Sequence, residues 1–222
     1  MITMNQIGSA ALLALSLTLV GCSSKVAEPT QYSGFLSDYS QLKATDSPSG
    51  HETLRWVSPN YKSSQYSGIY YTPVVFYPAA KPNARISQET LDRARSYLDE
   101  ELQKAAARHK PLVSWPGPGS LTLKTAITAV SAENQDLKFY EVVPVAAVVA
   151  STMAASGHRT QNSVLFLEVE LLDGRTGEPV IKVVRKAYGK SVPNNSTPIT
   201  FDDLRVAIDE MVRDAAAFPL PQ

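Results

Sequence analysis

The residues best placed by type and spacing to do acid–base chemistry are Glu168 and Glu170. They lie two apart in a segment that alternates apolar and polar residues, so a strand here would carry both on one face, about 6–7 Å apart. Paired carboxylates at such a separation are compatible with a hydrolase. Alternating glutamates are also typical of a strand face that is simply in water. We predict that both face outward, are not catalytic, and pair across a hairpin with the basic cluster of Lys182, Arg185, Lys186 and Lys190.

The other reactive residue types are scattered along the chain. His51, His109 and His158 lie far apart and outside any H-E-x-x-H pattern, so we expect no metal site. Residues 117–120 (GPGS) lack the trailing glycine of a nucleophile elbow and precede a predicted strand, which indicates a plain turn. The acidic run 99–101 falls on a predicted helix, where neighbouring side chains diverge by about 100°, so we predict a solvated face and not an acid–base pair. We expect no catalytic residue and no cofactor, and therefore no enzyme.

Cys22, the single cysteine of the chain, is the residue for which a covalent modification is predicted. Residues 19–22 (LVGC) fit each of the four positions of the bacterial lipobox. Residues 7–20 are apolar but too short to cross a bilayer, and fit the core of a secretion signal, although residues 1–6 contain no Lys or Arg. The alternative is a buried helix with a core cysteine, but polar sequence follows directly. We expect residues 1–21 to be a lipoprotein signal peptide, and Cys22 to carry a diacylglycerol and an N-acyl chain.

The predicted lipid on Cys22 sets the expected location and partners. Two or more acyl chains anchor a protein stably. Ser23, rather than Asp, follows the cysteine, which by resemblance to the lipoprotein sorting rule implies the periplasmic face of the outer membrane. Lys plus Arg and Asp plus Glu number 21 each, so the charge gives no case for nucleic acid. The expected partners are the bilayer and either an envelope protein or a second copy of the chain.

The elements that position these residues are predicted from their periodicity. Residues 22–50, rich in Ser, Thr, Pro and Gly, are typical of a tether that becomes ordered near Tyr32. Residues 51–222 are predicted to form a single α+β domain. Its expected helices cover residues 87–108, after Ser87 as N-cap, and a segment opened by Thr200. Its expected strands are 69–77, 121–130, 163–172 and 180–188, with an edge or bulge at Pro73 and a turn at 173–178.

The order of these elements predicts a topology. It is strand, helix, strand, insertion, hairpin and helix, which gives a mixed four-stranded sheet with two amphipathic helices packed on one face. The helix between the first two strands favours a parallel crossover between them.

An uncharged apolar insertion, about 138–159, does not fit this scheme. Its residues 142–155 (VVPVAAVVASTMAA) are too few to span a bilayer. Three interpretations stay open: a helix packed on the domain's own core, an exposed patch for a partner, a second copy or the membrane surface, and, least favoured, a membrane span. The candidate interface residues are Val142, Val145, Val148, Val149 and Met153.

Several motifs occur in an order that resembles a known family. They are residues 32–42 (YSGFLSDYSQL), 54–59 (LRWVSP), 73–75 (PVV), 140–145 (YEVVPV), 157–159 (GHR) and the D-x-x-T-G-E turn at 173–178. Together they resemble the proteobacterial lipoprotein family of unknown function numbered 3313. The resemblance implies a single-domain lipoprotein, and it carries no established activity and no site residues.

Three functions remain as hypotheses. The first is a non-enzymatic binding or envelope-assembly module anchored on the inner leaflet of the outer membrane. The second is a protective protein that binds a secreted toxin. The third is a periplasmic hydrolase that uses Glu168 and Glu170.

Overall fold

The computed structural model describes residues 26–134, 161–193 and 196–218. The predicted signal peptide, Cys22 and the candidate interface residues Val142 to Met153 lie outside the described residues. The structural account that follows concerns the three described ranges.

The described residues form one mixed sheet with two helices, as predicted for the fold class, but the sheet has eight strands rather than four. Its order is β1-β2-β8-β7-β6-β3-β5, and β4 pairs with β6. Pairing is antiparallel from β1 to β6 and parallel where β3 joins β6 and β5. The strands are β1 (Lys43–Asp46), β2 (Glu52–Val57), β3 (Gly68–Tyr71), β4 (Val75–Phe76), β5 (Leu112–Val113), β6 (Ser120–Asn134), β7 (Gln161–Asp173) and β8 (Pro179–Val192).

The four additional strands have local causes. Strand β1 (KATD) is polar and joins the sheet by pairing with β2, so its composition gives no signal. Strand β2 (ETLRWV) is short, and its buried Leu54 packs on the main core. Pro73 lacks an N–H, so the strand predicted over 69–77 splits into β3 and β4, both parallel to β6. Strand β5 has two residues, too few for any periodicity to register.

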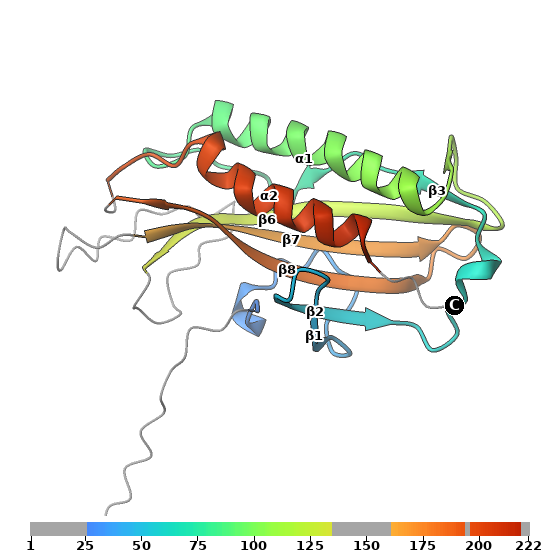
Figure 1. Ribbon diagram of the computed structural model, residues 1–222. Coiled ribbons are helices and arrows are strands. Elements are labelled where there is room, and N and C mark those ends of the chain that lie inside the picture. Colours follow the sequence, from blue (N-terminus) through green and yellow to red (C-terminus); the bar gives the residue numbers. More distant parts are fainter. Residues whose placement is uncertain (1–25, 135–160, 194–195, 219–222) are drawn as a thin grey trace, which may run out of the picture.

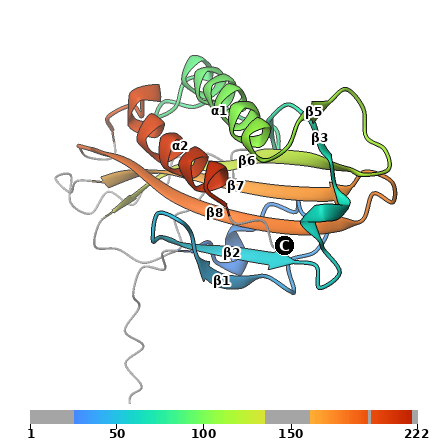
Figure 2. The same cartoon turned by 45° about the vertical axis from the view of Figure 1, so that its right-hand side comes forward.

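Both helices lie on the same face of the sheet, as Figures 1 and 2 show. Helix α1 (Gln88–His109) begins after Ser87, whose hydroxyl accepts the Thr90 N–H, and α2 (Phe201–Ala216) begins with a capping box of Thr200 and Asp203. These caps satisfy N–H groups that the first helical turn leaves unpaired, and they confirm both predicted starts.

Neither helix combines the length and apolar character needed to cross a bilayer, and no other described helix does. Two short 3-10 helices, η1 (Pro29–Gln31) and η2 (Ser63–Gln65), complete the described elements.

The main core lies between the helices and the sheet. Leu98 of α1 and Leu204 and Ile208 of α2 are fully buried against the sheet, together with Leu165 and Leu167 of β7. Each buried side chain of this size stabilises the fold by about 1.5–3 kcal/mol. The alternation of β7 therefore points its leucines toward the helices, and its intervening residues toward the opposite face.

Asp99 of α1 corrects the prediction that the acidic run 99–101 is only a solvated face. Its carboxylate accepts hydrogen bonds from the Tyr71 hydroxyl at 2.9 Å and the Val74 N–H at 2.7 Å. Burial, with the neighbouring Asp99 carboxylate, raises the pKa of the Tyr71 phenol. This side chain ties α1 to the connection between β3 and β4, whereas Glu100 and Glu101 pair with Lys104 on the helix surface.

Candidate functional site

The face of the sheet opposite the helices is covered by an N-terminal strap, residues 26–42 (Figures 1 and 2). Composition assigns this segment to a tether, yet Ala27 and Leu36 are buried in the main cluster of apolar residues. The strap adds no strand to the sheet. Both backbone and side-chain groups of the strap bind side chains of β7 and β8, and these contacts hold it on the sheet face.

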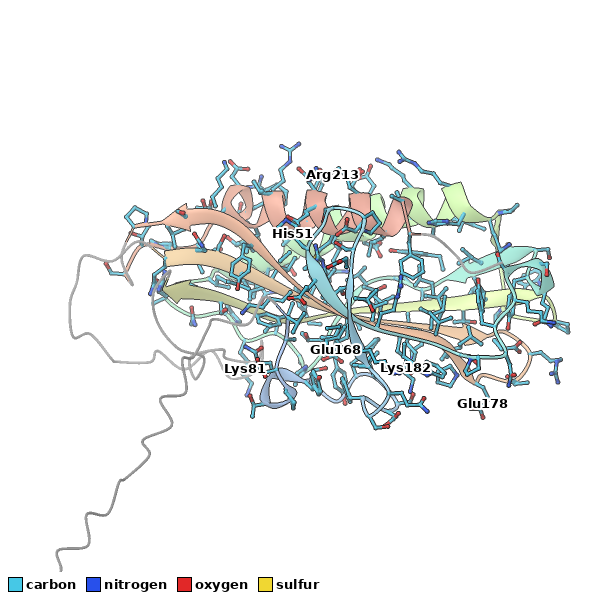
Figure 3. The ribbon with its side chains drawn as sticks, turned by 60° about the horizontal axis from the view of Figure 1, so that its bottom comes forward. His51, Lys81, Glu168, Glu178, Lys182 and Arg213 are labelled. Atoms are coloured by element: carbon cyan, nitrogen blue, oxygen red, sulfur yellow. The ribbon has the colours of Figure 1, made fainter. Side chains whose placement is uncertain are left out.

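Glu168 is the centre of these contacts and is 0% exposed. The Ser33 N–H donates to Oε1 at 2.9 Å, and the Tyr39 hydroxyl donates to Oε2 at 2.5 Å. Figure 3 looks toward the strap side of the molecule and labels Glu168 there. The strap thus donates a hydrogen bond to each carboxylate oxygen. These bonds compensate the buried charge of Glu168 and hold the strap at one position on the sheet.

Glu170 and Lys182, which neighbour Glu168 on the same sheet face, also bind the strap. Ser37 donates its N–H and its hydroxyl to Oε1 of Glu170, at 3.2 and 2.6 Å. The Lys182 ammonium donates to the Asp38 carbonyl at 3.0 Å and lies 3.5 Å from the Asp38 carboxylate. It also lies 5.0 Å from the centre of the Trp56 ring. The strap therefore offers donors to the two glutamates and acceptors to the lysine.

These positions correct the sequence prediction for the carboxylate pair. Glu168 and Glu170 share one strand face, as predicted, but they are buried and do not face water. The ion pairs of the returning strand also differ from those predicted, because Lys182 pairs with Asp38, and Arg185 points to the helix face and pairs with acids of α2.

Aromatic residues complete the contact of the strap with the sheet. The rings of Tyr32 and Tyr39 stack with their centres 4.5 Å apart. Phe35 contacts Tyr77 at 5.7 Å between ring centres, and the Lys124 ammonium lies 5.4 Å from the Phe35 ring. The prediction that the tether becomes ordered near Tyr32 is thus confirmed by these rings and by buried Leu36.

The Tyr39 hydroxyl titrates far from its usual range. Burial, and then the hydrogen bond to Glu168 and its negative charge, raise the pKa of Tyr39 from 10.0 to about 12. The neutral phenol donates to the carboxylate, whereas a phenolate would repel it. Tyr39 also accepts the Gly34 and Leu36 N–H groups at 2.8 and 3.1 Å, so it connects the strap to itself as well as to β7.

We predict that this phenol makes strap docking sensitive to high pH. Because the pKa in the folded protein lies above the unfolded value, the stabilisation is fully present below pH 10.0 and is lost as the pH rises through about 12. The difference in unfolding free energy between the wild type and Tyr39→Phe should therefore shrink between pH 10 and 12. Urea unfolding across this range measures it, and a constant difference would contradict the prediction.

The histidines and the serine that the sequence analysis considered and set aside have separate partners. The His51 Nε2 lies 3.5 Å from the Glu210 carboxylate, and the His109 Nε2 lies 2.7 Å from the Ala215 carbonyl oxygen. The Ser120 hydroxyl donates to the Gly117 carbonyl at 2.8 Å, which closes the predicted turn. Within the described ranges, no three His, Cys, Asp or Glu side chains gather as metal ligands. His158 lies outside these ranges.

A second polar cluster, which the sequence analysis did not anticipate, joins β8 to α2. The buried Arg185 guanidinium donates to Glu210 at 2.5 Å and to Asp214 at 2.8 Å. Asp214 also accepts the N–H and hydroxyl of Ser49, at 2.8 and 2.9 Å, from the turn between β1 and β2. The sequence of α2 does contain a hint of this cluster, because Asp214 falls among the buried residues of the helix. The partner of Asp214, Arg185, lies 29 residues earlier, so the sequence around Asp214 does not identify it.

A family model described as "Protein of unknown function (DUF3313)" matches residues 31–215. The chain belongs to this family. The match confirms the resemblance drawn from the motifs, and it spans most of the strap, the whole sheet, helix α1 and all but the last residue of α2. DUF3313 carries no assigned activity in its description, so the roles of the strap and of the Arg185 cluster rest on their geometry.

A curated relative matches most of the chain. The "Uncharacterized lipoprotein YdcL" of Escherichia coli K12 is 47% identical over 202 residues, which are 91% of each chain. Two solved structures are more distant. The hypothetical protein CT253 of Chlamydia trachomatis has a TM-score of 0.38 and 10% identity over 69% of this chain and 97% of its own. The PelC dodecamer of Paraburkholderia phytofirmans has a TM-score of 0.34 and 9% identity, covering 77% and 97%. Scores this low do not establish a common fold.

Proposed function

We propose that the chain is a lipoprotein of the outer membrane, anchored through acylated Cys22 on the periplasmic side, and that it acts by binding rather than by catalysis. The observation that carries the proposal is the docked strap, which begins at Val26. The E. coli relative is named a lipoprotein, which supports the anchor. The serine at position 23 supports the outer membrane as the destination.

The strap determines how closely the anchor would hold the domain. Three residues, 23–25, separate Cys22 from Val26, the first described residue, which packs on the main core. An extended chain rises at most 3.6 Å per residue, so the lipidated cysteine would lie within about 14 Å of the domain. The face of the sheet that carries the strap would then turn toward the bilayer, and the helix layer away from it. Such a domain would meet partners at the membrane surface, as an assembly or binding module does.

The same geometry argues against a hydrolase. Glu168 and Glu170 are 0% and 3% exposed, and the strap occupies both oxygens of Glu168 and Oε1 of Glu170. A general acid or base must come within hydrogen-bond reach of its substrate. These two carboxylates would reach one only after the strap had left the sheet.

The anchor is tested by Cys22→Ser and Ser23→Asp in cells fed a labelled fatty acid. We expect Cys22→Ser to take up no label, and Ser23→Asp to keep the label but to sediment with the inner membrane. Ser23→Thr is the matched control and should remain in the outer membrane. A label retained by Cys22→Ser, or none in the wild type, would contradict the anchor.

The binding role is tested on the same membranes with an amine-reactive crosslinker. A discrete crosslinked species in the wild type, absent when Cys22→Ser releases the protein, is the expected result. Recovery of the monomer alone across crosslinker concentrations would contradict a binding or assembly role, while leaving the anchor intact.

A further inference from the structure

A cavity of about 150 Å³ lies between the sheet and the C-terminal halves of the two helices. It is on the other side of the sheet from the strap. The helix positions above it are small, namely Ala105 and Ala106 of α1 and Ala215 of α2, and short side chains such as Val169 and Val183 lie beneath. The N-terminal halves of the same helices fill this layer with leucine and isoleucine. The cavity thus results from residue size, and its walls are almost entirely apolar.

Two buried polar atoms at the cavity have no hydrogen-bond partner among the described residues. One is Oγ1 of Thr125, which is 2% exposed, and the other is Nε of Arg185, which is 5% exposed. Both residues line the cavity. A buried polar group without a partner costs about 1–3 kcal/mol, and native proteins rarely tolerate one. Each atom can donate a hydrogen bond, so an oxygen acceptor on an occupant would satisfy the donor that it reaches.

The shape and chemistry of the cavity walls indicate what kind of molecule could fill the rest of the cavity. The lining extends from Ile69 on β3, across β6, β7 and β8, to Arg55 on β2. Four strand spacings amount to about 19 Å, so a volume of 150 Å³ spread beneath them is a narrow space. Its walls are aliphatic, and Phe218 and His109 are the aromatic side chains among them. A slender aliphatic chain fits such a space better than a ring that needs a stacking surface. Dry apolar cavities of this size take up small apolar molecules.

The charges around the cavity favour a neutral head group. Arg185 is matched by Glu210 and Asp214, which leaves one excess negative charge. The Arg55 guanidinium, 4.8 Å from the centre of the Phe218 ring, supplies one positive charge at the rim. These charges balance, so an anionic head would gain little over a neutral one.

We propose that this cavity binds a single aliphatic chain with a neutral oxygen acceptor, such as an alcohol, ketone or ester. The aliphatic walls hold the chain, and the oxygen accepts a hydrogen bond from Thr125, in the same lining as the unpaired Nε of Arg185. The site is separate from the strap, and it does not depend on the lipid at Cys22.

Binding is tested without detergent, which would compete for the cavity. A cleavable secretory signal replaces residues 1–22, which keeps every described contact because the described core begins at Val26. Hexan-1-ol, hexane and hexanoate are titrated while methyl NMR signals of Leu102, Val183 and Ile181 are followed. We expect saturable shifts with hexan-1-ol, and affinity for hexanoate no higher. Ala105→Leu fills the cavity and should abolish the shifts, whereas Ala107→Leu, which adds the same atoms on the exposed face of α1, should retain them.

A second variant tests the hydrogen bond to the oxygen of the ligand, and it leaves the volume of the cavity unchanged. Thr125→Val keeps the shape of the side chain and removes the unpaired hydroxyl, so it should fold at least as stably as the wild type. Hexan-1-ol should bind it about fivefold more weakly, the equivalent of one ordinary hydrogen bond, with no change for hexane. The proposal is overturned by an absence of saturable shifts in the wild type, by equal binding to a folded Ala105→Leu, by equal hexan-1-ol affinity in Thr125→Val, or by tighter binding of hexanoate.

Discussion

Replacing Glu168 with alanine should lower the free energy of unfolding by about 3 kcal/mol, because hydrogen bonds to a charged group contribute about 1.5–3 kcal/mol each. The variant leaves the Ser33 N–H and the Tyr39 hydroxyl facing a space without an acceptor. Urea unfolding at neutral pH measures the loss. Glu178→Ala is the matched control: its side chain is exposed in the turn after β7, and surface substitutions of this kind stay within about 0.5 kcal/mol.

A second readout separates loss of strap docking from general destabilisation. In Glu168→Ala the strap should open locally before the sheet unfolds, since docking is the contact removed. Chymotrypsin should then cleave after Tyr32 and Phe35 under conditions in which the wild type and Glu178→Ala are resistant. The account of Glu168 would be contradicted if the strap of the variant resisted chymotrypsin at all urea concentrations below those that unfold the whole domain.

Replacing Arg185 with methionine should have the largest effect, a loss of about 3–5 kcal/mol in the free energy of unfolding. This is the usual cost of removing one partner from a buried ion pair, because the remaining charge stays buried and uncompensated. The remaining acids, Glu210 and Asp214, have side chains only 16% and 10% exposed. The turn that carries Ser49 also loses its fixed acceptor when Asp214 is no longer held in place. Arg213→Met, at an exposed position on α2, is the control and should cost little.

The pairing itself is tested by adding Asp214→Asn to Arg185→Met. Neutralising the uncompensated acid should recover part of the lost stability, so the two substitutions should couple by at least about 1 kcal/mol in a double-mutant cycle. Additive losses would mean that Arg185 stabilises the fold by packing alone. Thermal unfolding of the four proteins at one pH provides the comparison.

The elements that sequence reasoning located correctly are those with local signals. Ser87 and Thr200 cap helices through bonds to residues three positions later, so the sequence around each start contains the whole motif. The alternation of β7 likewise indicates which residues share a face. Local signals of this kind depend on nothing outside the segment.

The buried face of Glu168 and Glu170 could not be predicted in the same way. Alternation shows that they share a face, but whether that face meets water depends on a segment far away in the chain. The strap that covers them has the composition of a linker, since its Ser, Tyr and Asp residues bind through hydrogen bonds rather than through an apolar stripe. The cavity under the helices was equally hidden, because Ala105 and Ala215 show only that the helices have small residues, not what lies beneath them.

The strap also sets an order of events during synthesis. Its main acceptor, Glu168, lies 135 residues after Ser33, so the amino end of the chain has nothing to bind until β7 has been made. Until then this stretch stays accessible to enzymes that process a nascent chain. Its docking is a late step, which closes the fold only after the central strands have formed.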